Sequence, residues 1–279
     1  MNMKLNQLFL LVLFFSFESC SKPEGNTIPV QYSGTKILIH KGGGDGEFSL
    51  YPPNSLSACK EGLQYADGIE IDIQKSRSGS AWLYHDEYFL EEGSNKKARL
   101  PELYDDEINV HFNSVGNNFS LIKLEEIFEY HQKINSTKMI HLDVKSWLPS
   151  LYSDGFGYLN KLADEIIRLS DKYGMANNLI IECENGLLLN RFRKHSTKFQ
   201  LYLDSYGDFK TAMKRVMKEN YTGVSCKVTD NNLSENIISE MHQNGLKVQV
   251  WTINNEADLL QYISWKADII LTDNIQFVQ

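Results

Sequence analysis

Short runs of β-branched and other apolar residues alternate along this chain with longer amphipathic stretches. From residue 37 onward, the apolar runs have the length of strands, and the stretches between them repeat apolar positions at helical spacing. The pattern predicts strands at 37–40, 68–74, 81–85, 139–144, 178–183, 199–203, 222–228, 247–253 and 268–272. It predicts helices at 54–66, 121–133, 157–173, 186–195, 209–219, 233–244 and 255–265. A strand followed by a helix, repeated many times, indicates a parallel sheet.

The number of repeats favours a closed barrel over an open sheet. A TIM barrel, or (β/α)₈ barrel, needs about eight strand–helix units, and no Pro/Gly/Ser-rich linker divides the segment that contains them. No GxGxxG or GxxxxGKS sequence supports nucleotide binding in an open, doubly wound sheet. We therefore predict an α/β fold of the TIM-barrel type, with residues 36–279 forming a single domain.

One pair of predicted strands is joined too closely for a parallel crossover. Six residues separate 68–74 from 81–85, so we expect this pair to form an antiparallel hairpin. A two-residue turn at Ser78-Gly79 would place His85 opposite Asp72, and a bulge would shift that pairing by one residue. The hairpin would bring an imidazole and a carboxylate into one small site.

The first twenty residues have the pattern of an export signal. Lys4 precedes an unbroken apolar run over residues 8–15, which is too short for a helix that spans a membrane. Phe17-Glu18-Ser19-Cys20 resembles a bacterial lipoprotein box with Cys20 as the lipid acceptor. We predict a signal peptide over 1–19, a lipid-anchored tether over 20–35, and an exported lipoprotein of the bacterial cell envelope. Ordinary cleavage nearby, with a free Cys20, is the alternative.

Composition narrows the choice of partner. The 279 residues are 42% hydrophobic and 23% charged with a formal net charge of -8, as in ordinary soluble globular proteins. Without a dense stripe of lysine and arginine, the chain is not expected to bind nucleic acid through bulk charge. An anionic substrate would have to be bound locally, by a cation or by a few placed basic groups.

Acidic residues occupy alternate positions of the predicted strand 68–74. Side chains alternate along a strand, so the isoleucines at 69, 71 and 73 would face outer helices, while Glu70 and Asp72 would face the barrel interior near its mouth. Buried carboxylates are costly unless they bind a cation. A solvent-facing strand with ordinary polar residues is the alternative.

Further polar candidates lie at the ends of other predicted strands. His40 ends the first strand, His85 ends the strand 81–85, and Asp143 and Lys145 lie two residues apart at the end of 139–144. An internal salt bridge between Asp143 and Lys145 is the alternative for that pair. Barrel enzymes keep their sites at the C-terminal ends of the strands, so the joint occurrence of these residues there indicates a functional site.

At these residues the sequence resembles the glycerophosphodiester phosphodiesterase family. The order and spacing of eight blocks carry the resemblance, which covers the chain from about residue 37 to the C-terminus. The blocks are His40-Lys41-Gly42, Asn54-Ser55-Leu56, Gly68-Ile69-Glu70-Ile71-Asp72-Ile73, His85-Asp86, Leu124-Glu125-Glu126, Asp143-x-Lys145, Trp251-Thr252-Ile253-Asn254 and Ile269-Ile270-Leu271-Thr272-Asp273. The resemblance implies a barrel that hydrolyses glycerophosphodiesters to sn-glycerol 3-phosphate and an alcohol.

The resemblance also implies roles for individual residues. Glu70, Asp72 and Asp143 would hold one divalent cation, for which oxygen ligands suit Ca²⁺ or Mg²⁺. His40 and His85 would exchange protons as general base and general acid. Substrate and phosphate contacts would come from Lys41, Lys145, Asn54 and Trp251. Weaker candidates are Glu182 and Glu184, as an extra ligand or a hydroxyl contact, and Lys227, as an anion contact. An inward salt bridge is the alternative for the glutamates.

Three departures from the family pattern keep other functions open. Lys41 stands where the family has arginine, Pro53 where it has glutamate, and Asp143 where it has a longer glutamate. A lysine offers a point charge in place of a two-pronged guanidinium. The alternatives are a related lipid or polyol phosphodiesterase, and a surface-anchored binding lipoprotein that has kept the barrel but lost turnover.

Overall fold

The computed structural model describes residues 34–90, 97–114, 117–147, 155–229 and 233–279. These described residues group into one compact unit. The predicted signal peptide, Cys20 and almost all of the predicted tether lie outside the described residues. Within the described ranges, no helix combines the length and apolar character needed to cross a membrane.

Eight parallel strands close into a barrel, which confirms the predicted fold class. β1 (Lys36–Ile39) pairs with both β2 (Gly68–Lys75) and β11 (Ile269–Thr272), so the first and last strands of the barrel are neighbours. The ring continues in the order β11, β10, β9, β8, β7, β6 and β2. The remaining strands are β6 (Met139–Val144), β7 (Leu179–Cys183), β8 (Gln200–Asp204), β9 (Gly223–Lys227) and β10 (Lys247–Trp251).

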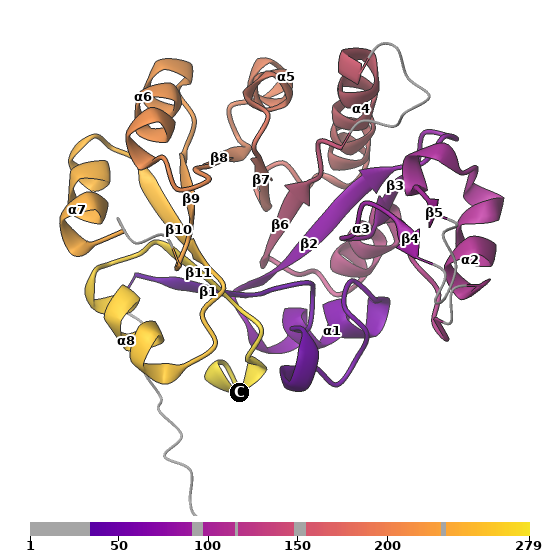
Figure 1. Ribbon diagram of the computed structural model, residues 1–279, viewed down its shortest axis with the longest axis horizontal. Helices are drawn as coiled ribbons and strands as arrows, with labels where there is room; N and C mark the ends of the chain where they lie inside the picture. Colours follow the sequence, from indigo (N-terminus) through magenta and orange to yellow (C-terminus); the bar gives the residue numbers. More distant parts are fainter. Residues whose placement is uncertain (1–33, 91–96, 115–116, 148–154, 230–232) are drawn as a thin grey trace, which may run out of the picture. The chain divides into compact units, whose positions relative to one another are not determined.

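Helices surround the barrel, as Figure 1 shows. Each predicted helix is present: α1 (Leu56–Tyr65), α3 (Leu124–Lys133), α4 (Gly155–Tyr173), α5 (Gly186–His195), α6 (Phe209–Glu219), α7 (Glu235–Gln243) and α8 (Glu256–Ser264). The two ends of α7 show how local sequence determines where a helix begins and ends. The Ser234 side chain accepts a hydrogen bond from the Ile237 N–H at the first turn. Gly245, with φ +73°, lets the chain leave the helix in a left-handed conformation.

Alternation along the strands produces two apolar layers. In β2, Ile69, Ile71 and Ile73 are fully buried and belong to the main cluster between the strands and the helices. Inside the barrel, a smaller cluster contains Leu38 and Ile180 and is completed by Tyr202, Ile269 and Leu271. On these strands a polar residue follows two positions after a cluster residue, and therefore lies over the inner cluster: His40, Glu182, Asp204 and Asp273.

The predicted hairpin is present, but its register differs from the prediction by one residue. β3 (Ala81–Leu83) is antiparallel to the end of β2, with Leu83 opposite Ile73. The connection is a three-residue loop, since the Ser76 N–H bonds to the Ser80 carbonyl and Gly79 has φ +104°. Such a loop contains one residue more than the two-residue turn that we expected. The Tyr84 N–H therefore donates to the Asp72 carbonyl at 3.1 Å, and His85 lies just beyond.

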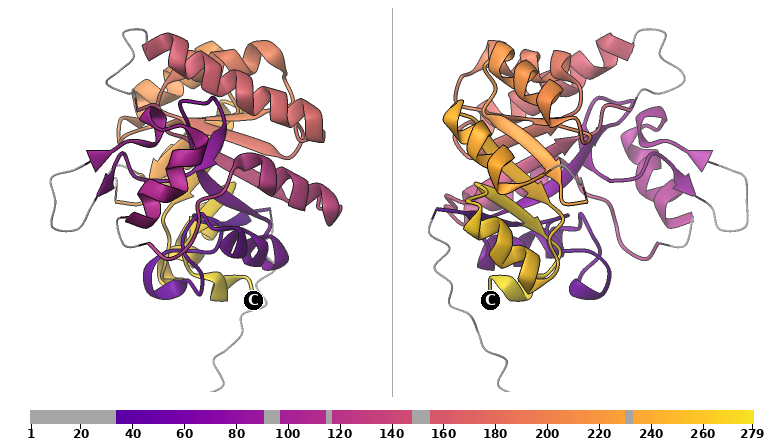
Figure 2. Two further views of the ribbon diagram at one scale, coloured as in Figure 1. Left: turned by 90° about the vertical axis from the view of Figure 1, so that its right-hand side faces the viewer. Right: turned by 60° about the vertical axis from the view of Figure 1, so that its left-hand side comes forward.

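An insertion between β3 and α3 lies to one side of the barrel (Figure 2). The hydrophobic pattern did not predict its helix. Its described elements are β4 (Phe89–Leu90), β5 (Lys97–Ala98), η2 (Leu100–Glu102) and α2 (Asp105–Ser114). Two further 3₁₀ helices lie outside the insertion, η1 (Gly46–Phe48) and η3 (Ile275–Phe277). Asp105, the first residue of α2, connects the insertion to the hairpin. Its carboxylate accepts hydrogen bonds from the Ser76 hydroxyl and from the indole N–H of Trp82 in β3.

Candidate active site

A cavity of about 170 Å³ lies among the C-terminal ends of the barrel strands. It brings together predicted residues that are far apart in the sequence. Those that line it are His40, Glu70, His85, Asp143, Lys145, Glu182, Glu184 and Trp251. Its other lining residues include Trp147, Asp204 and Tyr206, which the sequence did not single out.

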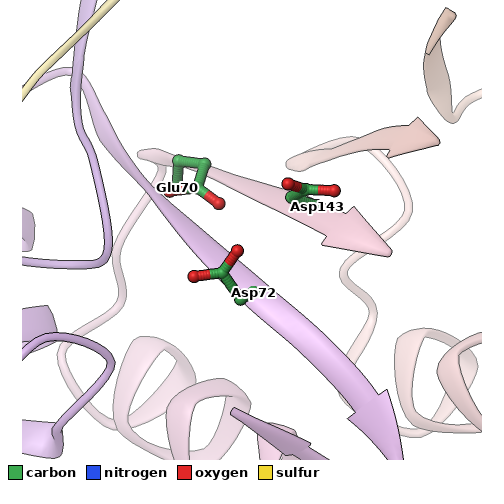
Figure 3. A group of neighbouring side chains, drawn as sticks. All are labelled: Glu70, Asp72 and Asp143. Carbon is green, nitrogen blue, oxygen red and sulfur yellow. The ribbon is translucent and has the colours of Figure 1, made fainter. Parts of the chain in front are cut away.

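Three carboxylates from two neighbouring strands point toward one another (Figure 3). Glu70 and Asp72 come from β2, and Asp143 of β6 is the register partner of Asp72. One oxygen of each lies within 4.8 Å of the other two. Glu70 Oε1 is buried and accepts no hydrogen bond, and buried Asp72 Oδ1 has only the Lys145 ammonium beside it. Carboxylate oxygens at this spacing fit a hard divalent cation such as Ca²⁺ or Mg²⁺.

Lys145 adds a positive charge to this acidic cluster. Its Nζ lies 2.6 Å from Asp143 Oδ2 and 2.7 Å from Asp72 Oδ1, the second contact having angles outside a hydrogen bond. Burial disfavours the charged form of Asp72, but the ammonium and both histidines outweigh it and lower its pKa to about 2. Burial and repulsion by Asp72 and Asp143 instead raise the pKa of Glu70. The internal salt bridge and the acidic cluster are therefore parts of one site.

The structure places two predicted substrate contacts behind the acids. The Asn54 amide is buried, donates to Asp72 Oδ2 at 2.8 Å and accepts from the Asp72 N–H at 3.1 Å. The Lys41 N–H donates to Glu70 Oε2 at 2.8 Å, while its ammonium lies 2.5 Å from Asp45 Oδ2. Neither side chain is among those that line the cavity. Both residues therefore hold an acid in place through their own hydrogen bonds.

Each predicted catalytic histidine has a carboxylate at Nδ1. His40 Nδ1 lies 2.8 Å from Asp273 Oδ1, and its Nε2 lies 3.8 Å from Glu70 Oε2. His85 Nδ1 lies 2.8 Å from Asp86 Oδ1. Neither aspartate was predicted to have a role, although Asp86 and Asp273 both fall within the blocks that carry the family resemblance. Their position beside the barrel mouth was the available signal.

Acidic side chains from β7 line another part of the cavity. Glu182 accepts a hydrogen bond from Gln249 Nε2 at 2.5 Å and also lies 3.0 Å from His141 Nε2, which is outside hydrogen-bond angles. Glu184, just after the strand, accepts hydrogen bonds from the hydroxyls of Ser146 and Tyr206. The hydrogen bonds to both glutamates therefore come from an amide and two hydroxyl groups, not from a lysine or arginine.

Two predicted residues from neighbouring strands differ in their access to the cavity. Trp251 of β10 lines it, as expected for a wall of the site. Lys227 of β9 is exposed and does not line it, with its Nζ 5.6 Å from the centre of the Trp251 ring. A direct anion contact by Lys227 therefore has no support from this arrangement.

Asp204 at the end of β8 is expected to make stability depend on pH. Burial and the neighbouring Glu182 raise its pKa from 3.8 to about 7. Between these values the folded protein keeps a proton that the unfolded chain has lost, so stability falls as pH rises through this window and stays lower above it. Asp204→Asn, which cannot ionise, should raise Tm by roughly 5 °C at pH 8 and change it little at pH 4.

Thermal unfolding at both pH values checks this expectation. The exposed Glu240 of α7 offers a matched control, because Glu240→Gln also removes one carboxylate. A gain in the Asp204 variant that is equal at both pH values, or that the control shares, would contradict the assignment.

Comparison with known proteins places this site in a family. The sequence model of the glycerophosphoryl diester phosphodiesterase family matches residues 43–277. The chain belongs to this family. Its class of enzyme is accordingly phosphoric diester hydrolase, as the resemblance predicted. The match begins at residue 43 and does not include His40, but the structure places the His40 ring 3.8 Å from Glu70.

Relatives and solved structures of the same kind cover most of the chain. A glycerophosphodiester phosphodiesterase from Caldanaerobacter subterraneus is 22% identical over 86% of this chain and 94% of its own length. A glycerophosphodiester phosphodiesterase from Bacillus altitudinis is 23% identical over 86% of this chain and 94% of its own length. A putative glycerophosphoryl diester phosphodiesterase structure from Silicibacter pomeroyi has a TM-score of 0.74 at 16% identity, covering 88% of this chain and 92% of that chain. These likenesses support the glycerophosphodiester phosphodiesterase barrel.

Proposed function

We propose that this phosphodiesterase hydrolyses glycerophosphodiesters to sn-glycerol 3-phosphate and an alcohol, with the help of one divalent cation. The convergence of Glu70, Asp72 and Asp143 within 4.8 Å, in a site that also holds His40, carries the proposal. A structure from Oleispira antarctica supports the product, because it is described as a phosphodiesterase in complex with sn-glycerol-3-phosphate. It has a TM-score of 0.66 at 15% identity and covers 88% of this chain and 95% of that chain.

The three acids hold the cation in this proposal. When bound, it supplies a Lewis acid that polarises the phosphate and offsets its charge. Lys145 lies close enough to share this work, since its ammonium can turn from Asp143 toward a phosphoryl oxygen. Oxygen ligands are compatible with both Ca²⁺ and Mg²⁺.

The two histidines move the protons. His40 takes a proton at Nε2 from the water that attacks phosphorus, because its Nδ1 is already engaged with Asp273. The oxygen of that water stays on the phosphate of sn-glycerol 3-phosphate, and the bond to the departing alcohol breaks. His85 gives a proton to the oxygen of the departing alcohol, so that the alcohol leaves as a neutral molecule. Both rings line the cavity, which allows them to act on one substrate.

A product assay tests the function directly. The purified protein, given glycerophosphocholine with Ca²⁺ or Mg²⁺, should release glycerol 3-phosphate over many turnovers, measured through its enzymatic oxidation. Stoichiometric binding of the substrate with no product would instead favour the binding lipoprotein.

We also propose that the protein is exported and carries lipid on Cys20. The support is the sequence pattern of residues 1–20, which lies outside the described residues. Metabolic labelling with a radioactive fatty acid, compared between the natural chain and Cys20→Ser, tests the anchor. Equal labelling of both proteins would exclude Cys20 as the acceptor.

A further inference from the structure

Asp273 contacts a proposed catalytic group but has no part in the proton transfers described above. We propose that Asp273, held by Asn254, is a positioning residue that fixes His40 in the tautomer whose Nε2 lone pair faces the cavity. The effect on catalysis rests on the proposed function. The tautomer itself does not, and it can be observed without any substrate.

The contact between Asp273 and His40 joins the two ends of the barrel sequence. Asp273 directly follows β11, and His40 directly follows β1, its neighbour in the sheet. Asp273 is only 8% exposed, and its Oδ1 lies 2.8 Å from His40 Nδ1. A carboxylate only accepts hydrogen bonds, so Nδ1 carries the hydrogen and Nε2 keeps the lone pair. His40 Nε2, which carries this lone pair, lies 3.8 Å from Glu70 Oε2.

Asn254 fixes the other oxygen of the same carboxylate. Its Oδ1 accepts a hydrogen bond from the Asp273 N–H at 2.9 Å, which sets the direction of the amide group. Its Nδ2 is then left to donate to Asp273 Oδ2 at 2.7 Å. Close packing holds the backbone as well, because a Cβ at Gly44 would lie 2.1 Å from the Asp273 carbonyl oxygen. The carboxylate therefore has one oxygen for Asn254 and one for His40.

The pair at His85 lacks these restraints. His85 and Asp86 show the same 2.8 Å separation, but their side chains are 43% and 69% exposed. Water competes for both partners at such a position, so the hydrogen bond imposes less order on the ring. Asp86 therefore provides a matched control for a His–Asp contact without burial.

An asparagine in place of Asp273 should reverse the tautomer. Asn254 Nδ2 would still need an acceptor, so the oxygen of the new amide would face it. The NH₂ group would then face His40 Nδ1, which would have to accept, and the ring hydrogen would move to Nε2. The same reasoning accounts for the loss of roughly 10⁴-fold in kcat when the triad aspartate of a serine protease becomes asparagine.

The test compares Asp273→Asn, Asp273→Ala and Asp86→Asn with the natural chain. Two-bond ¹H–¹⁵N spectra of histidine-labelled protein, recorded where the ring is neutral, report the His40 tautomer, and kcat is measured with glycerophosphocholine. We expect Nδ1–H in the natural chain and in Asp86→Asn, but Nε2–H in Asp273→Asn. Asp273→Asn should lose about 10²- to 10⁴-fold in kcat, no more than loss of the His40 ring itself and at least as much as Asp273→Ala.

A merely structural role predicts the opposite order, because asparagine has the shape of aspartate and alanine does not. The proposal is overturned if His40 keeps Nδ1–H in Asp273→Asn, or if that variant retains kcat within threefold while alanine loses it. Nε2–H in the natural chain would also overturn it, whether or not the variants fold. Absence of turnover in the natural chain, together with the tautomer reversal, would refute the proposed function and support the positioning role.

Discussion

Chelation of divalent cations should stop the release of glycerol 3-phosphate, and addition of Ca²⁺ or Mg²⁺ should restore it. Glu70 Oε1 is a buried acceptor without a donor, and Asp72 Oδ1 has only the Lys145 ammonium beside it, so both oxygens could serve as ligands of the proposed cation. A metal's stabilisation of transition-state charge amounts to several kcal/mol, or about 10³-fold or more in rate. Initial rates before and after EDTA treatment, and after readdition of each ion, measure the effect.

Asp72→Asn separates cation binding from folding. It removes one ligand charge while keeping the shape of a side chain that Asn54 holds. We expect calorimetry to show weaker Ca²⁺ or Mg²⁺ binding and circular dichroism to show a folded protein. Glu240→Gln on the surface of α7 should leave binding unchanged. Full activity in EDTA, or unaltered affinity in the Asp72 variant, would remove the cation from the proposal.

Replacement of His40 by alanine should lower kcat by about 10²- to 10⁴-fold, which is the usual contribution of general acid–base catalysis. The ring lies between Glu70 of β2, at 3.8 Å, and Asp273 just after β11, at 2.8 Å. Its loss removes the proposed proton acceptor but none of the three proposed carboxylate ligands. Steady-state kinetics with glycerophosphocholine, alongside calorimetric cation binding, measure the two properties separately.

His195→Ala offers the matched control for this change. His195 ends α5, is 38% exposed and pairs with the surface Asp171, away from the cavity. We expect it to retain the activity of the natural chain. A His40→Ala protein that keeps more than a tenth of the rate would assign the base to another group.

The barrel and its acids could be predicted because their signals are local. Alternation of apolar and acidic residues in β2 determines which face each side chain takes, and repetition of strand and helix determines the topology. The hairpin register could not be predicted, because the loop contains one additional residue, Arg77, before Ser78-Gly79, and this shifts every pair by one position. A sequence pattern rarely distinguishes a two-residue loop from a three-residue loop around Ser-Gly.

The supporting residues of the site were missed for a different reason. Asp273 becomes significant only when β11 lies beside β1, a contact across 233 positions of the chain. Asp204 looks like an ordinary polar end of a strand until Glu182 is placed beside it. Asn54 was identified but given a substrate contact, because its own residue type does not reveal that it faces Asp72.

Lys145 has a consequence for how the proposed cation would enter the site. Its ammonium, tethered to the same strand end, already contacts Asp72 and Asp143 at ion-pair distance. A newly made chain can thus assemble its barrel mouth with a built-in counterion, before any ion is encountered. If the proposed cation binds these carboxylates, it would replace the lysine as their partner and leave the ammonium available to the substrate.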